Sequence, residues 1–154
     1  MLNLSYANFA NAYRHYASLD RSSLSAELGW EERGAQFTNG ALLASLALLT
    51  LGSPVPGTQR IEAGHLIGRR VCNGANRLAD WLSERHVTPE IIPLEQGLSD
   101  VAYQLFGRRG IVAFIQGTGP AGGLIGLLDG RNAPFLCRAA ESHYPLEIRF
   151  WELS

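Results

Sequence analysis

Lysine is absent from the 154-residue sequence, and all 13 basic residues are arginines. This absence excludes a Schiff-base lysine, a phosphate-loop lysine and a lysine general base, together with the enzyme classes that need them. The arginines are scattered and balanced by 14 acidic residues, which gives a formal net charge of -1. The sequence therefore lacks both the basic stripe that binds nucleic acids and the polybasic face that binds membranes.

Long hydrophobic runs are also missing. The longest, over residues 41–51, is about half the ~20 residues that a bilayer-spanning helix needs, so we expect no membrane span. The first residues lack the basic, apolar and small-residue regions of a secretory signal, so we expect no cleavable leader. The two cysteines, Cys72 and Cys137, allow at most one disulfide and do not identify a redox compartment.

The composition, 46% hydrophobic and 18% charged, is typical of an ordinary globular domain. No internal repeat or long linker divides the chain, so we expect residues 1–154 to form one domain. Hydrophobic periodicity predicts amphipathic helices over 4–19 and 71–82, the second capped by Asn73 or a neighbouring residue.

Residues 41–51 predict the central element of the core. They are strong helix formers and apolar on all sides, which is typical of a helix buried on most faces, and Asn39 could cap its start. Turn-forming and polar residues predict irregular structure elsewhere. The predicted loops are 20–38, 52–70 with a short extended piece at 60–63, and the connector 90–99.

The last third of the sequence has a different pattern of hydrophobic residues. Short apolar runs bounded by glycine, and one run that alternates apolar with charged residues, predict three strands. They cover 110–117, 123–130 and 146–153. Helices followed by strands indicate an α+β fold, in which a small antiparallel sheet packs on the buried helix.

The glycine-rich segment 117–123 could be taken for a phosphate loop. It leads into a predicted strand and has no following lysine, so we interpret it as a hairpin connection. Asp129, just before Gly130, is predicted to be a turn residue.

Two cysteine–histidine pairs could be proposed from proximity in the sequence. They are Cys72 with His65, and Cys137 with His143. Cys72 is the better candidate for an activated thiolate because Arg69 and Arg70 precede it, although a free cysteine is more often a small buried hydrophobe. No pair has the spacing of a zinc site, so we predict no metal, and nothing indicates a cofactor.

Several segments together resemble one known family, the type VI secretion amidase effectors of the fourth group. These are papain-like, NlpC/P60-like cysteine peptidases that cut peptide crosslinks in peptidoglycan. The resemblance covers most of the chain, and the order and spacing of the segments agree. The matching segments are 6–13, 37–46 (FTNGALLASL, against F-x-N-x-C-x-I-R-M-S), 71–82, 107–114 (GRRGIVAF), 123–130 (GLIGLLDG, against G-H-V-x-L-W-[ND]-G) and 150–153.

The catalytic positions of that family are apolar in this chain. By the resemblance, its nucleophilic cysteine falls at Ala41, its general-base histidine at Leu124 and its orienting aspartate near Phe135. An alkyl or phenyl group can neither attack a carbonyl nor carry a proton. Because three polar groups are lost, we expect Ala41 and Leu124 to face each other in a packed core or an apolar groove.

The leading hypothesis is therefore a catalytically inactive relative of these effectors that works by binding. The expected groove lies near Asn39, Gly40, Ala41, Gly123 and Leu124. Candidate partners are a peptidoglycan stem peptide, a component of the secretion apparatus and an immunity protein. Such a protein would reside in the bacterial cytoplasm before export, with delivery to a target-cell periplasm by a route that reads no signal. The alternative is an active cysteine hydrolase with a relocated nucleophile, Cys72 with His65 as base.

Overall fold

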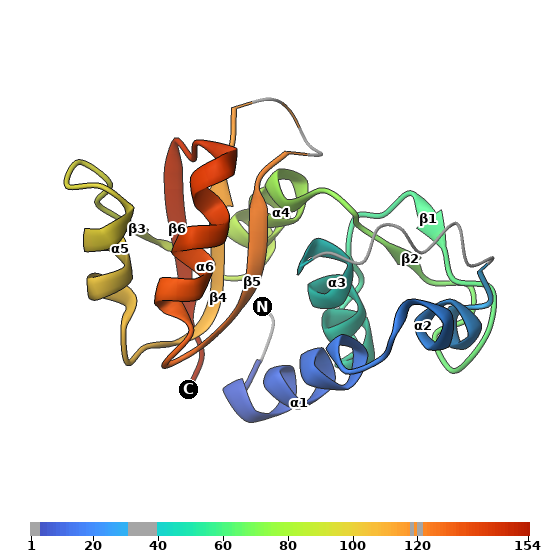
Figure 1. Cartoon of the computed structure of the whole chain (residues 1–154). Coiled ribbons are helices and arrows are strands. Elements are labelled where there is room, and N and C mark those ends of the chain that lie inside the picture. Colours follow the sequence, from blue (N-terminus) through green and yellow to red (C-terminus); the bar gives the residue numbers. More distant parts are fainter. Residues whose placement is uncertain (1–3, 31–39, 118, 120–121) are drawn as a thin grey trace.

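The computed structural model describes residues 4–30, 40–117, 119 and 122–154 (Figure 1). Helices dominate the first part of the chain, and the longer strands lie in the last third. In order, the elements are α1 (Tyr6–Ala17), α2 (Arg21–Leu28), α3 (Gly40–Thr50), β1 (Gln59–Arg60), β2 (Arg70–Val71), α4 (Ala75–Arg85), β3 (Glu90–Ile92), α5 (Leu98–Leu105), β4 (Arg109–Ile115), β5 (Leu124–Asp129), α6 (Ala133–Ala140), a 3-10 turn (Glu141–His143) and β6 (Glu147–Glu152).

Four strands form an antiparallel sheet in the order β3-β6-β4-β5, and β1 and β2 form a separate short pair. In the middle of the sheet, Ile111 of β4 lies opposite Trp151 of β6 and Leu127 of β5. The three predicted strands are confirmed as β4, β5 and β6. The connection between β4 and β5 is the predicted hairpin, and the α+β class with an antiparallel sheet is confirmed.

The sheet is covered by helices on both faces. One face packs against α1, α3 and α4 through a cluster that includes Ile125 and Leu127, and we call it the α3–α4 face. The opposite face packs against α5 and α6 through a cluster that includes Leu128 and Phe150, and we call it the α5–α6 face. In Figure 1, α6 runs along one side of the sheet while α3 and α4 lie towards the other.

Helix α3 is the predicted buried helix, and the side chains on its two sides differ in size. Ala41, Ala44 and Ala47 belong to the cluster that contacts the sheet. The leucines at 42, 46 and 49 point away from it, into a third cluster with α1, α2 and the β1–β2 region. Small side chains on the sheet side let the helix backbone approach β5 closely, while the leucines fill the wider space behind.

Two local predictions in the first half of the chain were wrong. Residues 21–28, predicted as loop, form α2, because Asp20 accepts a hydrogen bond from the backbone N–H of Ser23 and Gly29 ends the helix in a left-handed conformation. The second amphipathic helix begins at Ala75 rather than 71. Val71 instead belongs to β2. The N-cap position falls at Gly74, the residue next to Asn73, within the predicted choice of Asn73 or a neighbour. Asn39 lies outside the described residues.

The predicted connector at 90–99 contains the strand β3 and the first residues of α5. β3 is an edge strand of three residues, too short to give a periodic signal, and it pairs with β6. α5 follows directly after Gly97 and packs on α6. Within the described ranges, no helix is both long enough and apolar enough to cross a membrane.

Candidate functional site

The site suggested by the sequence lies where the start of α3 meets the edge strand β5. A Cβ atom at Gly40 would collide with the carbonyl oxygen of Ile125, so the helix backbone rests directly on the strand. Because β5 is the last strand of the sheet, this contact also covers part of an edge that would otherwise be open. The elements that would carry the nucleophile and the base are therefore adjacent.

The side chains at the two expected positions pack in different places. Ala41 is 3% exposed and belongs to the cluster on the α3–α4 face. Leu124 is half-buried and packs against the cluster on the α5–α6 face. The backbones adjoin as expected, but the two side chains do not share one apolar cluster. Neither offers a group that could react.

The third position also differs from the expectation. Phe135 on α6 is 69% exposed. Its neighbour Leu136 turns towards β5 instead, where its Cδ2 lies 3.8 Å from the place that a Cβ on Gly126 would take. Of these two residues, Leu136 is the one that could influence a group on β5. It is as unreactive as Phe135.

Tyr13 is the titratable side chain that reaches this junction from α1. Its hydroxyl oxygen accepts a hydrogen bond from the backbone N–H of Leu127, and burial raises the pKa of the phenol above its ordinary value. A neutral phenol is a poor base and a poor nucleophile near neutral pH. Tyr13 therefore provides a hydrogen-bond partner for a backbone N–H on the edge of β5 and does not act as a nucleophile or a base. The sequence shows it only as a member of an amphipathic stripe.

The fallback nucleophile, Cys72, is built into the core. It is 3% exposed, its thiol donates to the carbonyl of Gly74, and burial raises the pKa of the thiol. Its backbone N–H and C=O both bond to the hydroxyl of Ser45 on α3, at 3.1 and 3.0 Å. His65 is exposed on the loop between β1 and β2, and no hydrogen bond joins it to Cys72 in the described structure.

The second thiol, Cys137 on α6, is also 3% exposed. Burial raises its pKa to about 11. A thiol with so high a pKa is almost entirely protonated at neutral pH and is a weak nucleophile. Both cysteines are free thiols. Among the described residues, no three histidine, cysteine or acidic side chains are placed to hold one metal ion.

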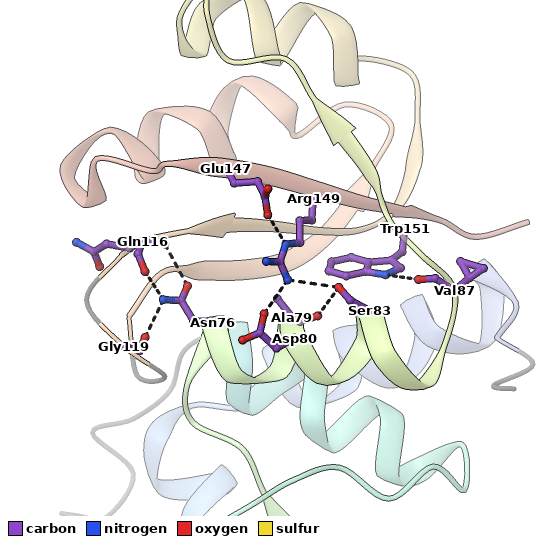
Figure 2. Close-up of polar contacts among 10 residues, drawn as sticks. All are labelled: Asn76, Ala79, Asp80, Ser83, Val87, Gln116, Gly119, Glu147, Arg149 and Trp151. Carbon is purple, nitrogen blue, oxygen red and sulfur yellow. Dashed lines mark hydrogen bonds and ion pairs between the residues drawn. The ribbon is translucent and has the colours of Figure 1, made fainter.

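A polar network fixes the hairpin loop that leads into Leu124 (Figure 2). Asn76, near the start of α4 and 7% exposed, donates through its side-chain amide to the carbonyls of Gln116 and Gly119. Its side-chain oxygen accepts from the N–H of Gln116, and the Gln116 side chain accepts from the N–H of Gly123. Gly123 is left-handed, at φ +87°, and a Cβ there would collide with Asn76. Only glycine fits this position.

A second network ties α4 to β6 (Figure 2). The guanidinium of Arg149 lies 2.8 Å from Asp80 and 2.5 Å from Glu147, and it also bonds to Ser83. The indole N–H of Trp151 donates to the carbonyl of Val87 just after the helix. These contacts hold α4 on the sheet. Neither network was found from the sequence, because both join residues far apart along the chain.

Sequence comparisons find no relative: no protein-family model matches the chain, and no curated protein matches it significantly. Comparison with solved structures does find similar proteins. The type VI effector Tae4 from Enterobacter cloacae matches with a TM-score of 0.66 at 19% identity, covering 100% of both chains. The Tae4–Tai4 effector–immunity complex from the same organism gives 0.68 at 18% identity, covering 99% of this chain and 100% of the matched one. The Tae4/Tai4 system from Salmonella typhimurium gives 0.67 at 17%, covering 97% and 98%.

These matches run from end to end, so they concern the whole arrangement of helices and strands. The chain is an α+β protein in which a buried helix packs on an antiparallel sheet, as the resemblance implied. More particularly, it has the fold of the type VI effector Tae4. The resemblance seen in the sequence is thereby confirmed for the fold.

Proposed function

We propose that this chain is a non-catalytic relative of the type VI peptidoglycan amidase effectors, and that it acts by binding. The observation that carries the proposal is the set of side chains at Ala41, Leu124 and Phe135. An amidase of this kind needs a thiolate, an imidazole to take its proton and a group that orients the imidazole. Alkyl and phenyl groups at the corresponding positions supply none of the three.

The rest of the chain supports the same proposal. Cys72 and Cys137 are buried, and the pKa of each thiol is raised, whereas a nucleophilic cysteine needs an accessible thiol with a lowered pKa. His65 is exposed, and within the described residues no hydrogen bond joins it to Cys72. A relocated Cys72–His65 centre would therefore need the β1–β2 region to rearrange. The scaffold around the former centre, by contrast, is closely packed.

As the partner we propose an immunity protein of the Tai4 type. Several of the matching structures are complexes of Tae4 with Tai4, and the present chain spans nearly the whole effector fold. The surface near Gly40, Ala41, Gly123 and Leu124, together with Asn39, is the proposed contact. A peptidoglycan stem peptide and a secretion component are the other candidates. We also propose that the chain folds as one domain and is exported from the bacterial cytoplasm to a target-cell periplasm.

Incubation of the purified protein with peptidoglycan sacculi tests the absence of catalysis. Tae4 from Enterobacter cloacae serves as the active reference. We expect no soluble peptide fragments from this chain, because no described thiol is both accessible and paired with a base. Release of fragments that Cys72→Ala or Cys137→Ala abolishes would refute the non-catalytic assignment.

Thiol labelling at mildly acidic pH tests the alternative directly. An activated thiolate reacts under these conditions, whereas a buried, protonated thiol does not. We expect neither Cys72 nor Cys137 to be modified in the folded protein. Both should be modified after unfolding in urea at mildly alkaline pH, where an exposed ordinary thiol forms enough thiolate to react. Selective labelling of Cys72 in the folded protein, lost in His65→Ala, would favour the relocated nucleophile.

Calorimetric titration with the Tai4 protein of Enterobacter cloacae tests the proposed partner. Leu124→Arg should weaken binding by about tenfold or more, because a charge would enter a half-buried contact. Ile67→Arg is the matched control, since Ile67 is 60% exposed on the β1–β2 loop. Equal loss in both variants, or binding of stem peptide but not of Tai4, would contradict an immunity partner.

A further inference from the structure

A concave surface lies away from the α3–β5 junction, between α5 and α6 on the outer side of the α5–α6 face. It has a volume of about 390 Å³. Its walls are mainly apolar, and the buried residue Cys137 is part of the lining. The lining residues that carry the argument are Tyr103, Phe106, Arg138 and Glu141.

Two aromatic side chains on the α5 wall are strongly exposed. Tyr103 is 84% exposed and Phe106 is 60% exposed. Aromatic residues beside an apolar groove are typical of protein–protein interfaces, where they become the anchors that carry most of the binding energy. The exposed aromatic side chains thus indicate that this groove is covered by a protein surface.

The α6 wall carries one positive and one negative charge, on Arg138 and Glu141. Neither side chain has an ion-pair or hydrogen-bond partner in the described part of the chain. Arg108 and Arg149, in contrast, each contact two acidic residues. This wall therefore offers an unpaired cation on α6 and, three residues later, an unpaired anion at the start of the 3-10 turn that follows the helix.

We propose that a second copy of this chain occupies the groove. If two α6 helices pack antiparallel about a two-fold axis, Arg138 of each copy meets Glu141 of the other, which forms two ion pairs from one surface. Tyr103 and Phe106 of each copy then cover the apolar wall of the other. With a formal net charge of only -1, two copies repel each other weakly. This dimer does not depend on the proposed effector relationship.

Sedimentation velocity of the full chain, over a wide range of concentration, tests the dimer. We expect a reversible monomer–dimer equilibrium. Phe106→Ser should weaken it by about tenfold or more, because an anchor is truncated. Arg138→Glu and Glu141→Arg should each weaken it by placing like charges together, and the double variant should restore it. Ile67→Ser, which removes an exposed apolar side chain elsewhere, should leave it unchanged.

Circular dichroism of each variant establishes that the monomer remains folded, which the exposure of these side chains favours. A chain that stays monomeric at high concentration overturns the proposal. So does a dimer that is insensitive to Phe106→Ser, or a double charge exchange that fails to restore association. Binding of Tai4 that Phe106→Ser abolishes, with the chain monomeric throughout, would assign the groove to a different partner.

Discussion

The two faces of the sheet are attached to their helices in different ways. On the α3–α4 face, polar contacts join helices to strands at several points, through Tyr13, Asn76 and Arg149 as well as through apolar packing. On the α5–α6 face, the described contacts are mainly apolar. The polar ones are the bonds of Asn132 to β5 at the start of α6, the bond from the Gln104 side chain to the carbonyl of Pro93, and the guanidinium of Arg108 over the Phe150 ring. Polar contacts thus fix the helices of the α3–α4 face to the sheet at several points, whereas the α5–α6 face leaves a groove between its two helices.

This difference indicates where a binding function can reside. The α3–β5 junction carries the positions at which the sequence resemblance places a catalytic centre. There Ala41 is buried on the α3–α4 face and Gly40 contacts the strand backbone. A partner at that junction meets a preformed surface with little room to adapt. The groove between α5 and α6 can accept side chains without disturbing any helix–sheet bond.

The largest expected effect comes from adding a methyl group at the junction. In Gly40→Ala the new Cβ would overlap the carbonyl oxygen of Ile125, and backbone atoms on both elements cannot move aside cheaply. We expect a loss of at least about 3 kcal/mol in the free energy of unfolding, measured by urea denaturation.

Gly117→Ala is the matched control. There the nearest atom to a new Cβ is the flexible end of Leu146, at 2.8 Å, which can rotate away. We expect less than about 1 kcal/mol of destabilisation. If the two variants were equally stable, α3 would not rest on β5 as closely as described.

The next largest effect is expected at the loop network. Asn76→Ala removes three side-chain bonds, two to half-buried Gln116 and one to exposed Gly119. We expect a loss of about 2 kcal/mol. Amide hydrogen exchange should also become faster in the loop before Leu124.

Asn132→Ala is the comparison on the other face, since Asn132 also makes side-chain bonds to backbone groups. It should destabilise the start of α6 but leave exchange in the β4–β5 loop unchanged. Faster exchange in that loop in both variants would mean that the helix–sheet contacts on the two faces do not act independently of each other.

A smaller effect concerns alkaline pH and the α5–α6 face. Cys137 has a pKa of about 11 when folded, against 9.0 for an unperturbed thiol. In that interval the unfolded thiol loses its proton and the folded one keeps it, so stability is present below pH 9 and falls as the pH rises towards 11. Urea denaturation across this range should show a shallower fall for Cys137→Ala. An identical fall would mean that the thiol is better solvated than its burial indicates.

The smallest effect is expected at the ion pair between α4 and β6. Asp80 is 65% exposed, so Asp80→Asn should cost less than about 1 kcal/mol, and the cost should shrink further in high salt. Glu84→Gln, on the same helix and without a described partner, should be neutral. A loss several times larger for Asp80→Asn would show that Arg149 depends on this contact to stay in place.

The sequence was sufficient for the parts of the fold that rest on local pattern. The apolar helix α3 and the strands β4, β5 and β6 each have a clear hydrophobic signal. The missed elements include α2, which depends on its two caps, and β2, β3, α5 and α6, which are short. At the candidate site, the prediction placed the right elements side by side but could not assign their side chains to faces.

Residue identity alone established that positions 41 and 124 carry no reactive group, because an alkyl side chain has neither a lone pair nor an exchangeable proton in any environment. It could not show that Leu136, not Phe135, turns towards β5, or that Asn76 holds the loop before Leu124. Those arrangements follow from how distant segments pack. A side chain's neighbours are set by the burial of whole helices and strands, which no local pattern of residues encodes.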